Sequence, residues 1–219
     1  RYYIDEPERI EGNNLRSWLI SSYATLNQIQ ADNKLEDRII FEEIPSGQTW
    51  LTCIADAMRR NRVLSITHQG FGKPEPSTFE IEPYCLKVVK RRWYVVARSP
   101  YYSERNKEKG IKPVDVYRVY ALDRISDIQD TGKTFKMKKD FDVNQYFEGC
   151  CGVITSDEPI QRIVLLAYGG FADYLRTLPL YESQREIEGD DESTLFEYHL
   201  KPTFDFYQLV LAQGDQVEV

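Results

Sequence analysis

An alternation of side chains over residues 85–98 constrains the fold of this chain more than any other feature. A period of two is typical of a β-strand, in which successive side chains point to opposite faces. The stretch contains two such runs, joined by a short basic turn. We therefore expect a hairpin with one packed face, which includes Trp93, and one face that presents Tyr94 and Arg98.

Tyr94 and Arg98 lie four residues apart, about 13 Å along a strand. An aromatic ring and a guanidinium on one face stack on and pair with an anionic planar ligand. Arg118 and Tyr120 repeat this arrangement in a second predicted strand, 115–121. Two such strands side by side would suit phosphate pairing and base stacking. The alternative is that Tyr94 is a core residue and Arg98 a solvated surface charge.

The hairpin resembles the Trp-Tyr-Leu signature of the WYL-domain family, with Val95 at the leucine position. Two flanking stretches fit the family pattern as well. Residues 81–86 are similar to its apolar-x-Pro-x-x-Leu motif, and residues 118–125 are similar to its Arg-x-Phe/Tyr-x-Leu-Asp-Arg-Ile motif. Three motifs in the family's order over 45 residues, 81–125, form a more specific signal than the Trp-Tyr pair alone.

The resemblance implies an Sm-like, SH3-type β-barrel that senses a ligand, often inside bacterial transcription regulators. Some members of the family respond to single-stranded DNA, and others are thought to bind nucleotides. Members usually carry a winged helix-turn-helix upstream, through which they bind DNA. Residues 1–61 contain no clear recognition helix and no initiating Met. We therefore expect either a truncated regulator or one that works without that domain.

The candidate ligand site combines the two strand faces with two residues at their edge. His68 alternates with Leu64 and Ile66, so it is either a core residue or part of the ligand face. The family commonly has Tyr at this position. Arg124 either pairs with Asp123 at the barrel rim or contacts the ligand. The six candidate residues are His68, Tyr94, Arg98, Arg118, Tyr120 and Arg124.

The order of the predicted elements indicates an α+β chain with four parts. Helical apolar spacing from Leu15 to Ile29 and from Trp50 to Met58 predicts two helices before the barrel. The Ser, Lys, Glu, Gly and Pro content of 99–113 predicts a mobile loop. The predicted parts are a helical linker segment 1–61, a WYL Sm-like barrel 62–130, a linker 131–158, and a ferredoxin-like βαββαβ extension 159–219.

Charge is distributed unevenly along the chain. The formal net charge is −7, which argues against broad affinity for nucleic acid. Residues 62–124, however, contain 13 Lys and Arg and 7 Asp and Glu, a local charge of +6. Residues 131–219 contain 8 and 16, a local charge of −8. A basic module inside an acidic chain is the asymmetry that a binding function has to explain.

The sequence contains none of the common catalytic or metal-binding motifs. Its four cysteines form no Cys-x-x-Cys pair and its two histidines stand far apart, so we expect no metal and no cofactor. Phosphate-loop, dinucleotide-binding and nucleophile-elbow motifs are missing too, so we do not expect an enzyme. The sequence has no secretory signal and no apolar run of about 18 residues, so we expect a cytoplasmic protein with reduced thiols and no membrane span.

These observations lead to one hypothesis and two alternatives. The chain is predicted to be the ligand-sensing and dimerisation part of a WYL-type transcription regulator, which binds single-stranded nucleic acid or a nucleotide. The first alternative is a sensor of a small anionic metabolite on the same basic face. The second is a purely structural dimerisation module. The aromatic surface of the helices predicted at 15–29 and 204–212 leads us to expect a homodimer.

Overall fold

The computed structural model describes residues 48–190 and 192–219, which fold into helices and two antiparallel sheets. The predicted α+β class is confirmed. The chain divides into two units, 1–44 and 45–219, and the described residues belong to the second. The helix predicted at 15–29 therefore lies outside them, and the four predicted domain limits stay predictions. No helix in the described ranges is long and apolar enough to cross a membrane.

The first sheet contains five strands in the order β4-β3-β2-β1-β5. Its strands are β1 (Arg62–His68), β2 (Ser77–Val89), β3 (Arg92–Arg98), β4 (Tyr117–Ala121) and β5 (Ile125–Thr134). Every pair of neighbours is antiparallel. In the described part of the chain β4 and β5 are the edges and do not pair, so the sheet is open and not a closed barrel. The Sm-like class remains a prediction.

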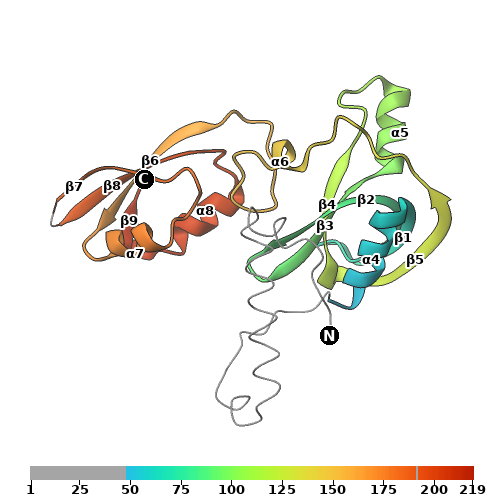
Figure 1. Ribbon diagram of the computed structural model, residues 1–219, viewed down its shortest axis with the longest axis horizontal. Coiled ribbons are helices and arrows are strands. Elements are labelled where there is room, and N and C mark those ends of the chain that lie inside the picture. The colour runs from blue at the N-terminus through green and yellow to red at the C-terminus, as the bar shows by residue number, and fades with distance from the viewer. Residues whose placement is uncertain (1–47, 191) are drawn as a thin grey trace, which may run out of the picture. The chain divides into compact units, whose positions relative to one another are not determined.

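Helix α4 (Gln48–Arg60) covers the packed face of this sheet. Figure 1 shows β1, β2 and β5 curving around it. Ile54 is fully buried in the core, and the Trp50 indole Nε1 donates a hydrogen bond to the Ile125 carbonyl at 3.0 Å. The apolar stripe from Trp50 to Met58 thus forms the predicted helix, although Ala57 and not Ala55 is buried.

The β2–β3 hairpin has the predicted two-strand form, with a bend in β2. The register shifts between Pro83 and Cys85, where a proline lacks the N–H that a ladder needs. The turn residues Lys90 and Arg91 have φ of 46° and 63°, the left-handed region that two-residue hairpin turns require. Trp93 packs against the core but is only partly buried, whereas we expected full burial.

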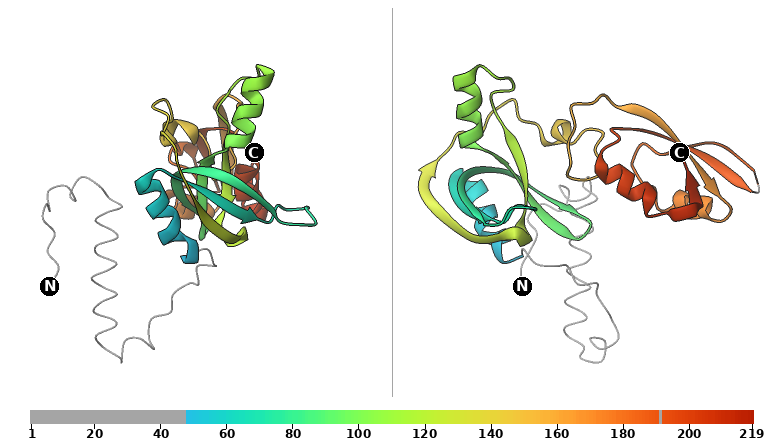
Figure 2. Two further views of the ribbon diagram at one scale, coloured as in Figure 1. Left: turned by 90° about the vertical axis from the view of Figure 1, so that its right-hand side faces the viewer. Right: turned by 180° about the vertical axis from the view of Figure 1, so that it is seen from behind.

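Residues 100–109 form a helix, so the predicted mobile loop at 99–113 is wrong. Helix α5 (Pro100–Lys109) stands away from the strands in both views of Figure 2. Ser99 is its N-cap and accepts a hydrogen bond from the Tyr102 N–H, and Gly110 ends it with φ of 64°. Ser, Pro and Gly at these positions are the usual start and stop signals of a helix. The same composition is also common in loops, which explains the error.

The segment predicted as a linker begins with the end of β5 and contains the short helix α6 (Val143–Tyr146). Its aromatic side chains pack on the first sheet. The Phe141 ring lies 4.5 Å from the Tyr117 ring and 4.9 Å from the Tyr84 ring, centroid to centroid. We predicted that aromatic residues attach this segment to one domain, and these contacts provide the attachment.

The second sheet has four strands in the order β7-β8-β6-β9. Its elements are β6 (Gln161–Tyr168), α7 (Phe171–Thr177), β7 (Arg185–Gly189), β8 (Ser193–Leu200), α8 (Phe204–Leu211) and β9 (Val217–Glu218). This is the β-α-β-β-α-β order that the sequence predicts; the ferredoxin-like class itself remains a prediction. Leu165, Phe196, Tyr198 and Phe206 are buried in the core of this part.

A buried carboxylate fixes the segment before β6 to helix α8. Asp205 in the first turn of α8 is 8% exposed and accepts hydrogen bonds from the Val153 and Ile154 N–H groups, both at 2.8 Å. Gly152 passes so close that a Cβ there would lie 2.2 Å from the Asp205 Oδ2 atom. Only glycine fits this approach without displacing the carboxylate.

We predict that Gly152→Ala lowers the free energy of unfolding by about 1–3 kcal/mol, because the added methyl overpacks the site and displaces Asp205. Gly170→Ala is the matched control, since a Cβ at Gly170 meets no atom within 4 Å. Urea unfolding followed by circular dichroism measures both. Equal midpoints for the two variants would show that the carboxylate moves away without cost.

Candidate functional site

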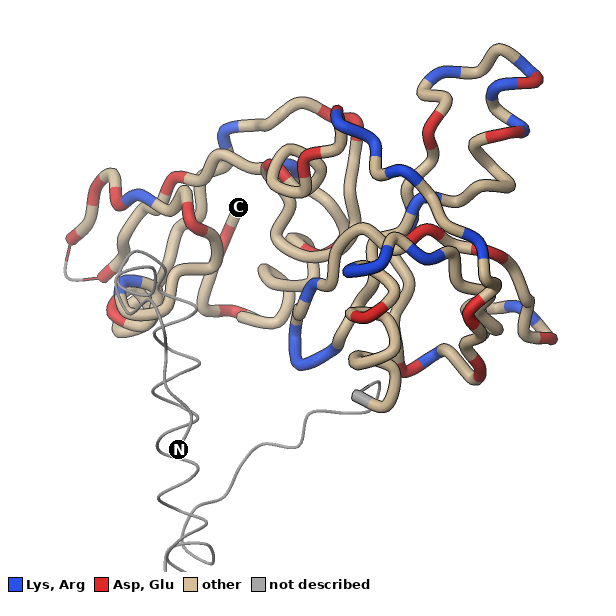
Figure 3. Tube along the Cα trace, turned by 45° about the vertical axis from the view of Figure 1, so that its right-hand side comes forward, with Lys and Arg blue, Asp and Glu red and all other residues tan. Residues whose placement is uncertain are grey.

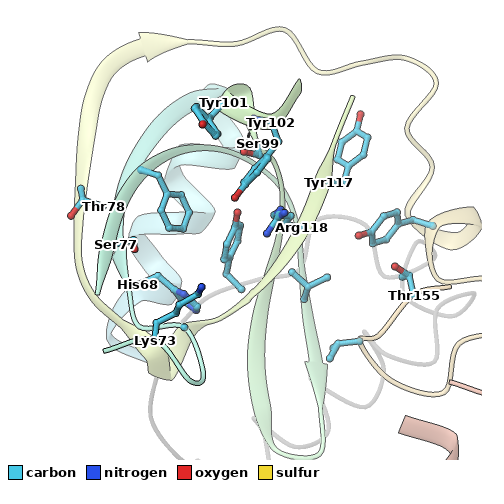
Figure 4. A pocket seen from close by; sticks show the side chains of 16 residues that line it. His68, Lys73, Ser77, Thr78, Ser99, Tyr101, Tyr102, Tyr117, Arg118 and Thr155 are labelled. Atoms are coloured by element: carbon cyan, nitrogen blue, oxygen red, sulfur yellow. Dashed lines mark hydrogen bonds between the residues drawn. The ribbon is translucent and has the colours of Figure 1, made fainter. Parts of the chain in front are cut away.

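A cavity of about 730 Å³ opens beside β4, at an edge of the first sheet. Its walls come from strands β1, β2 and β4, from helices α5 and α6, and from loop residues next to them. His68 lies at the end of β1, Phe79 in β2, Tyr102 in α5, and Arg118 and Tyr120 in β4. In Figure 4 Arg118 lies next to Tyr102, and His68 and Lys73 lie at the lower end of the cavity. Cationic and aromatic side chains thus meet around one hollow.

The register of β3 with β4 places Arg118 and Tyr120 on the core face. Tyr120 is opposite Val95, and Arg118 is opposite Ala97. Directly opposed residues of antiparallel strands point to the same side of a sheet. Val95 and Ala97 are fully buried in the core, so Arg118 and Tyr120 extend this face toward the cavity.

The other two predicted strand residues point the opposite way. Tyr94 is opposite Ala121, and Arg98 is opposite Tyr117. Neither Tyr94 nor Arg98 lines the cavity. The structure therefore does not bring the two Arg-plus-aromatic pairs together, and the predicted convergence of Tyr94 and Arg98 with Arg118 and Tyr120 is wrong.

Arg98 is held in a network of ion pairs. Its guanidinium contacts the Glu82 carboxylate at 3.1 Å and the Asp115 carboxylate at 2.5 Å, and its side chain is 16% exposed. The same Asp115 also pairs with Lys138 at 3.3 Å. We expected Arg98 to be mostly accessible, and it is not. Its charge is already neutralised by the chain.

Arg118 is exposed and differs from Arg98 in its partners. Its guanidinium carbon lies 3.9 Å from the centroid of the Tyr102 ring, a cation–π contact. Among the described residues, no carboxylate lies within ion-pair distance of Arg118 or of Lys73, which lines the same cavity. Other arginines of the module are paired, Arg62 with Asp130 and Arg92 with Asp123. Figure 3 marks the positions of Lys, Arg, Asp and Glu along the chain.

His68 is half-buried at the aromatic end of the cavity. Its ring meets the Tyr120 ring edge-on at 5.4 Å and lies 6.5 Å from the Phe79 ring. Its Nε2 atom is buried and has no hydrogen-bond partner among the described residues. An unpaired buried polar atom costs about 1–3 kcal/mol. Burial first, and then the charge of Arg124, lowers the pKa of His68 from its ordinary value, and Asp123 opposes the shift.

Arg124 lies beside the cavity and does not line it. It is part of the 3₁₀ turn η1 (Leu122–Arg124), and its guanidinium donates hydrogen bonds to the Gln69 carbonyl. The same group lies 3.6 Å from the centroid of the Phe71 ring. Arg124 thereby fixes the loop that carries Lys73. Asp123 pairs with Arg92, so the Asp123–Arg124 ion pair considered from the sequence does not form.

The cavity also contains aromatic residues that the sequence analysis did not select. Tyr101 and Tyr102 line it from the start of α5, with their ring centroids 5.1 Å apart. Recognising the helix signals around 99–110 would have placed these tyrosines next to β4. Phe79 could have been found from its alternation with Ile81 in β2, which puts both on the core face.

Residues 49–130 match the family model of the WYL domain. This segment is similar to WYL domains, and we call it the WYL domain below. The match covers α4 and nearly all of the first sheet, and it agrees with the motifs at 81–86, 92–97 and 118–125. The cavity is therefore built mainly by the WYL domain, and residues 146–155 after it complete one wall.

Two solved structures are similar to this chain at low identity. One is proteasome accessory factor B/C (PafBC) of Arthrobacter aurescens, with 18% identity, a TM-score of 0.34, and coverage of 81% of this chain and 25% of that one. The other is a CRISPR Cas-related protein, with 10% identity, a TM-score of 0.35, and coverage of 74% and 49%. This chain thus spans about a quarter and about half of their lengths. No curated protein matches it.

The different partners of the two arginines in the WYL domain lead to a stability prediction. Arg98→Ala should lower the free energy of unfolding by about 1–3 kcal/mol, because it leaves the largely buried Glu82 carboxylate without its cation and Asp115 with Lys138 alone. Arg118→Ala should change it by less than about 0.5 kcal/mol, as expected of an exposed residue without an ion pair.

Urea unfolding at neutral pH measures both variants. Near pH 4 the same measurement should give a smaller difference in the free energy of unfolding between Arg98→Ala and wild type. The reason is that protonated carboxyls repel each other less than carboxylates do. A larger loss for Arg118→Ala than for Arg98→Ala would contradict the assignment of the two faces.

Proposed function

We propose that this WYL domain is the ligand-sensing part of a transcription regulator and that it binds single-stranded nucleic acid or a nucleotide in the cavity beside Arg118. The observation that carries the proposal is the Arg118 guanidinium over the Tyr102 ring, exposed and without a carboxylate partner among the described residues. A guanidinium of this kind is suited to bidentate pairing with phosphate oxygens. The function is binding, without catalysis.

The aromatic residues around Arg118 support a ligand that carries bases. Tyr101 is 67% exposed and Tyr102 is partly exposed, so these rings offer faces on which bases stack. Tyr120 is only 7% exposed, and burial raises its pKa to about 12. We therefore assign stacking to Tyr101 and Tyr102 and give Tyr120 the role of cavity wall. Tyr94, which the sequence suggested for stacking, has no part in this arrangement.

The size of the cavity favours a second candidate, a small anionic metabolite. At about 730 Å³ the hollow lies within the range of roughly 300–1,000 Å³ that is typical of small-molecule sites. Arg118 and Lys73 would then bind a carboxylate or phosphate group. Dependence on ligand length separates the two candidates, because affinity for a strand rises with its length and affinity for a metabolite does not.

We predict that Arg118→Ala weakens binding of single-stranded oligothymidylate and lowers the slope of log affinity against log salt by about one unit. Tyr102→Ala should weaken binding and leave the slope unchanged, since stacking releases no counterion. Fluorescence anisotropy at several salt concentrations measures both effects, with labelled strands of about 4–16 nucleotides.

Arg105→Ala is the matched control for this titration. It removes the same charge from an exposed position of α5 that does not line the cavity. Equal loss of affinity in the Arg105 and Arg118 variants would indicate non-specific attraction. Failure of wild type to bind at low salt would favour the metabolite sensor, and binding of neither ligand class would favour a structural module.

We propose further that the second sheet and its helices form a homodimer or relay the signal. Helix α8 exposes an apolar stripe at i, i+3 and i+7: Phe204 is 61%, Tyr207 51% and Leu211 78% exposed. These three residues project from one side of the helix. Stripes of this kind mark protein–protein contacts more often than solvated surface.

We predict that the protein sediments as a dimer at about 10–100 μM, the range expected of a weak to moderate self-association. Tyr207→Lys should shift it to monomer, because the stripe would then carry a charge. Asp173→Lys is the control, since Asp173 is exposed in helix α7 and lies outside this stripe. A wild-type protein that stays monomeric over this range would contradict the dimer.

A further inference from the structure

His68 is the histidine that lines the cavity together with Arg118 and Lys73. Its imidazole packs edge-on against Tyr120, and its buried Nε2 atom has no hydrogen-bond partner among the described residues. In Figure 4 the Lys73 side chain lies beside it. A buried polar atom without a partner in the protein is usually satisfied by water or by a bound group.

The charged groups around His68 come from three elements. Asp123 and Arg124 of η1 act on the ring directly, and Arg118 of β4 and Lys73 of the loop between β1 and β2 line the same cavity. The neighbouring residues of β2 and β5, Ser77, Phe79 and Ile125, carry no charge. Asp123 is the one acid of this set and already pairs with Arg92. Cations therefore dominate the environment of the ring.

Protonation of His68 would add a further positive charge to this environment. Burial and Arg124 both lower the pKa of His68, so the imidazole is neutral in the free protein at neutral pH. An anion bound beside Arg118 and Lys73 raises the pKa of His68, because a negative charge nearby favours the protonated, positively charged imidazole. The free and bound states then differ in the protons they hold.

We propose that the cavity is a proton-coupled anion site, in which an anion bound beside Arg118 and Lys73 draws a proton onto His68. The WYL domain then binds its effector more tightly as the pH falls. The inference rests on the proposed sensing function and adds the regulation of the same site. It also gives a reason for a histidine at a position where the family commonly has tyrosine.

The direction and range of the pH effect follow from linkage. A group whose pKa is higher in the bound state takes up a proton on binding, so affinity rises as the pH falls through the bound-state pKa. The gain levels off below the free-state pKa, which burial and Arg124 lower from the ordinary value of a histidine. One proton changes affinity by at most tenfold per pH unit. We expect the affinity to rise roughly threefold or more between pH 7.5 and pH 6.0.

The test uses two probes that do not titrate in this range, oligothymidylate and inorganic sulfate. The chain contains two histidines, His68 and His199, so imidazole NMR signals are assigned with a single variant, His199→Gln. The pKa of His68 should rise on saturation with either probe. Oligothymidylate affinity should rise on acidification in wild type and in His199→Gln.

His68→Gln supplies the decisive variant, because glutamine donates and accepts hydrogen bonds but does not titrate. It should bind oligothymidylate with an affinity that is independent of pH. Oligothymidylate binding with no pH dependence and no change at His68 would overturn this inference and leave the proposed function standing. If wild type binds no oligothymidylate, the proposed function fails, and the sulfate titration tests the proton-coupled anion site by itself. A His68 pKa that rises with sulfate supports this site. A His68 pKa that does not change with sulfate overturns it.

Discussion

The pairing of Tyr120 with Val95 decides which side chains of the WYL domain can act together. It directs Arg118 and Tyr120 to the core face and leaves Arg98 on the other side of the same two strands. A shift of β4 by one residue would move Arg118 and Tyr120 to the side of Arg98 and turn Val119 to the core face. The buried positions of the strands fix this register, so the cavity depends on the same contacts that hold the sheet together.

The strands could be predicted from the sequence, but the relation between their faces could not. Alternation assigns each residue to one of two sides within a strand. In the β2–β3 hairpin a two-residue turn also fixes the register across strands. β3 and β4, by contrast, are separated by 18 residues that include α5, so no local rule relates Tyr94 to Arg118. The sequence therefore predicted both Arg-plus-aromatic pairs correctly as pairs and combined them wrongly as one surface.

Local net charge also did not predict which cations are free to bind a ligand. The +6 of residues 62–124 suggested several free cations, yet Arg62, Arg92 and Arg98 each pair with a carboxylate in the folded chain. Such pairs join residues far apart in sequence, and composition does not reveal them. What makes Arg118 a candidate for binding is the ring beneath it and the absence of an acid among the described residues around it. A count of charges would rank it equal to Arg98.

One wall of the cavity is formed by residues 153–155, and hydrogen bonds from Asp205 of α8 hold the same segment in place. Val153 and Thr155 line the hollow, and the N–H groups of Val153 and Ile154 are bound by Asp205 of α8. Gly152 leaves this carboxylate no room to move toward the segment. A ligand that displaces this wall must therefore stretch or break the Asp205 hydrogen bonds. The segment thus gives a physical route from the cavity to the helix with the exposed apolar stripe, through two hydrogen bonds to one carboxylate.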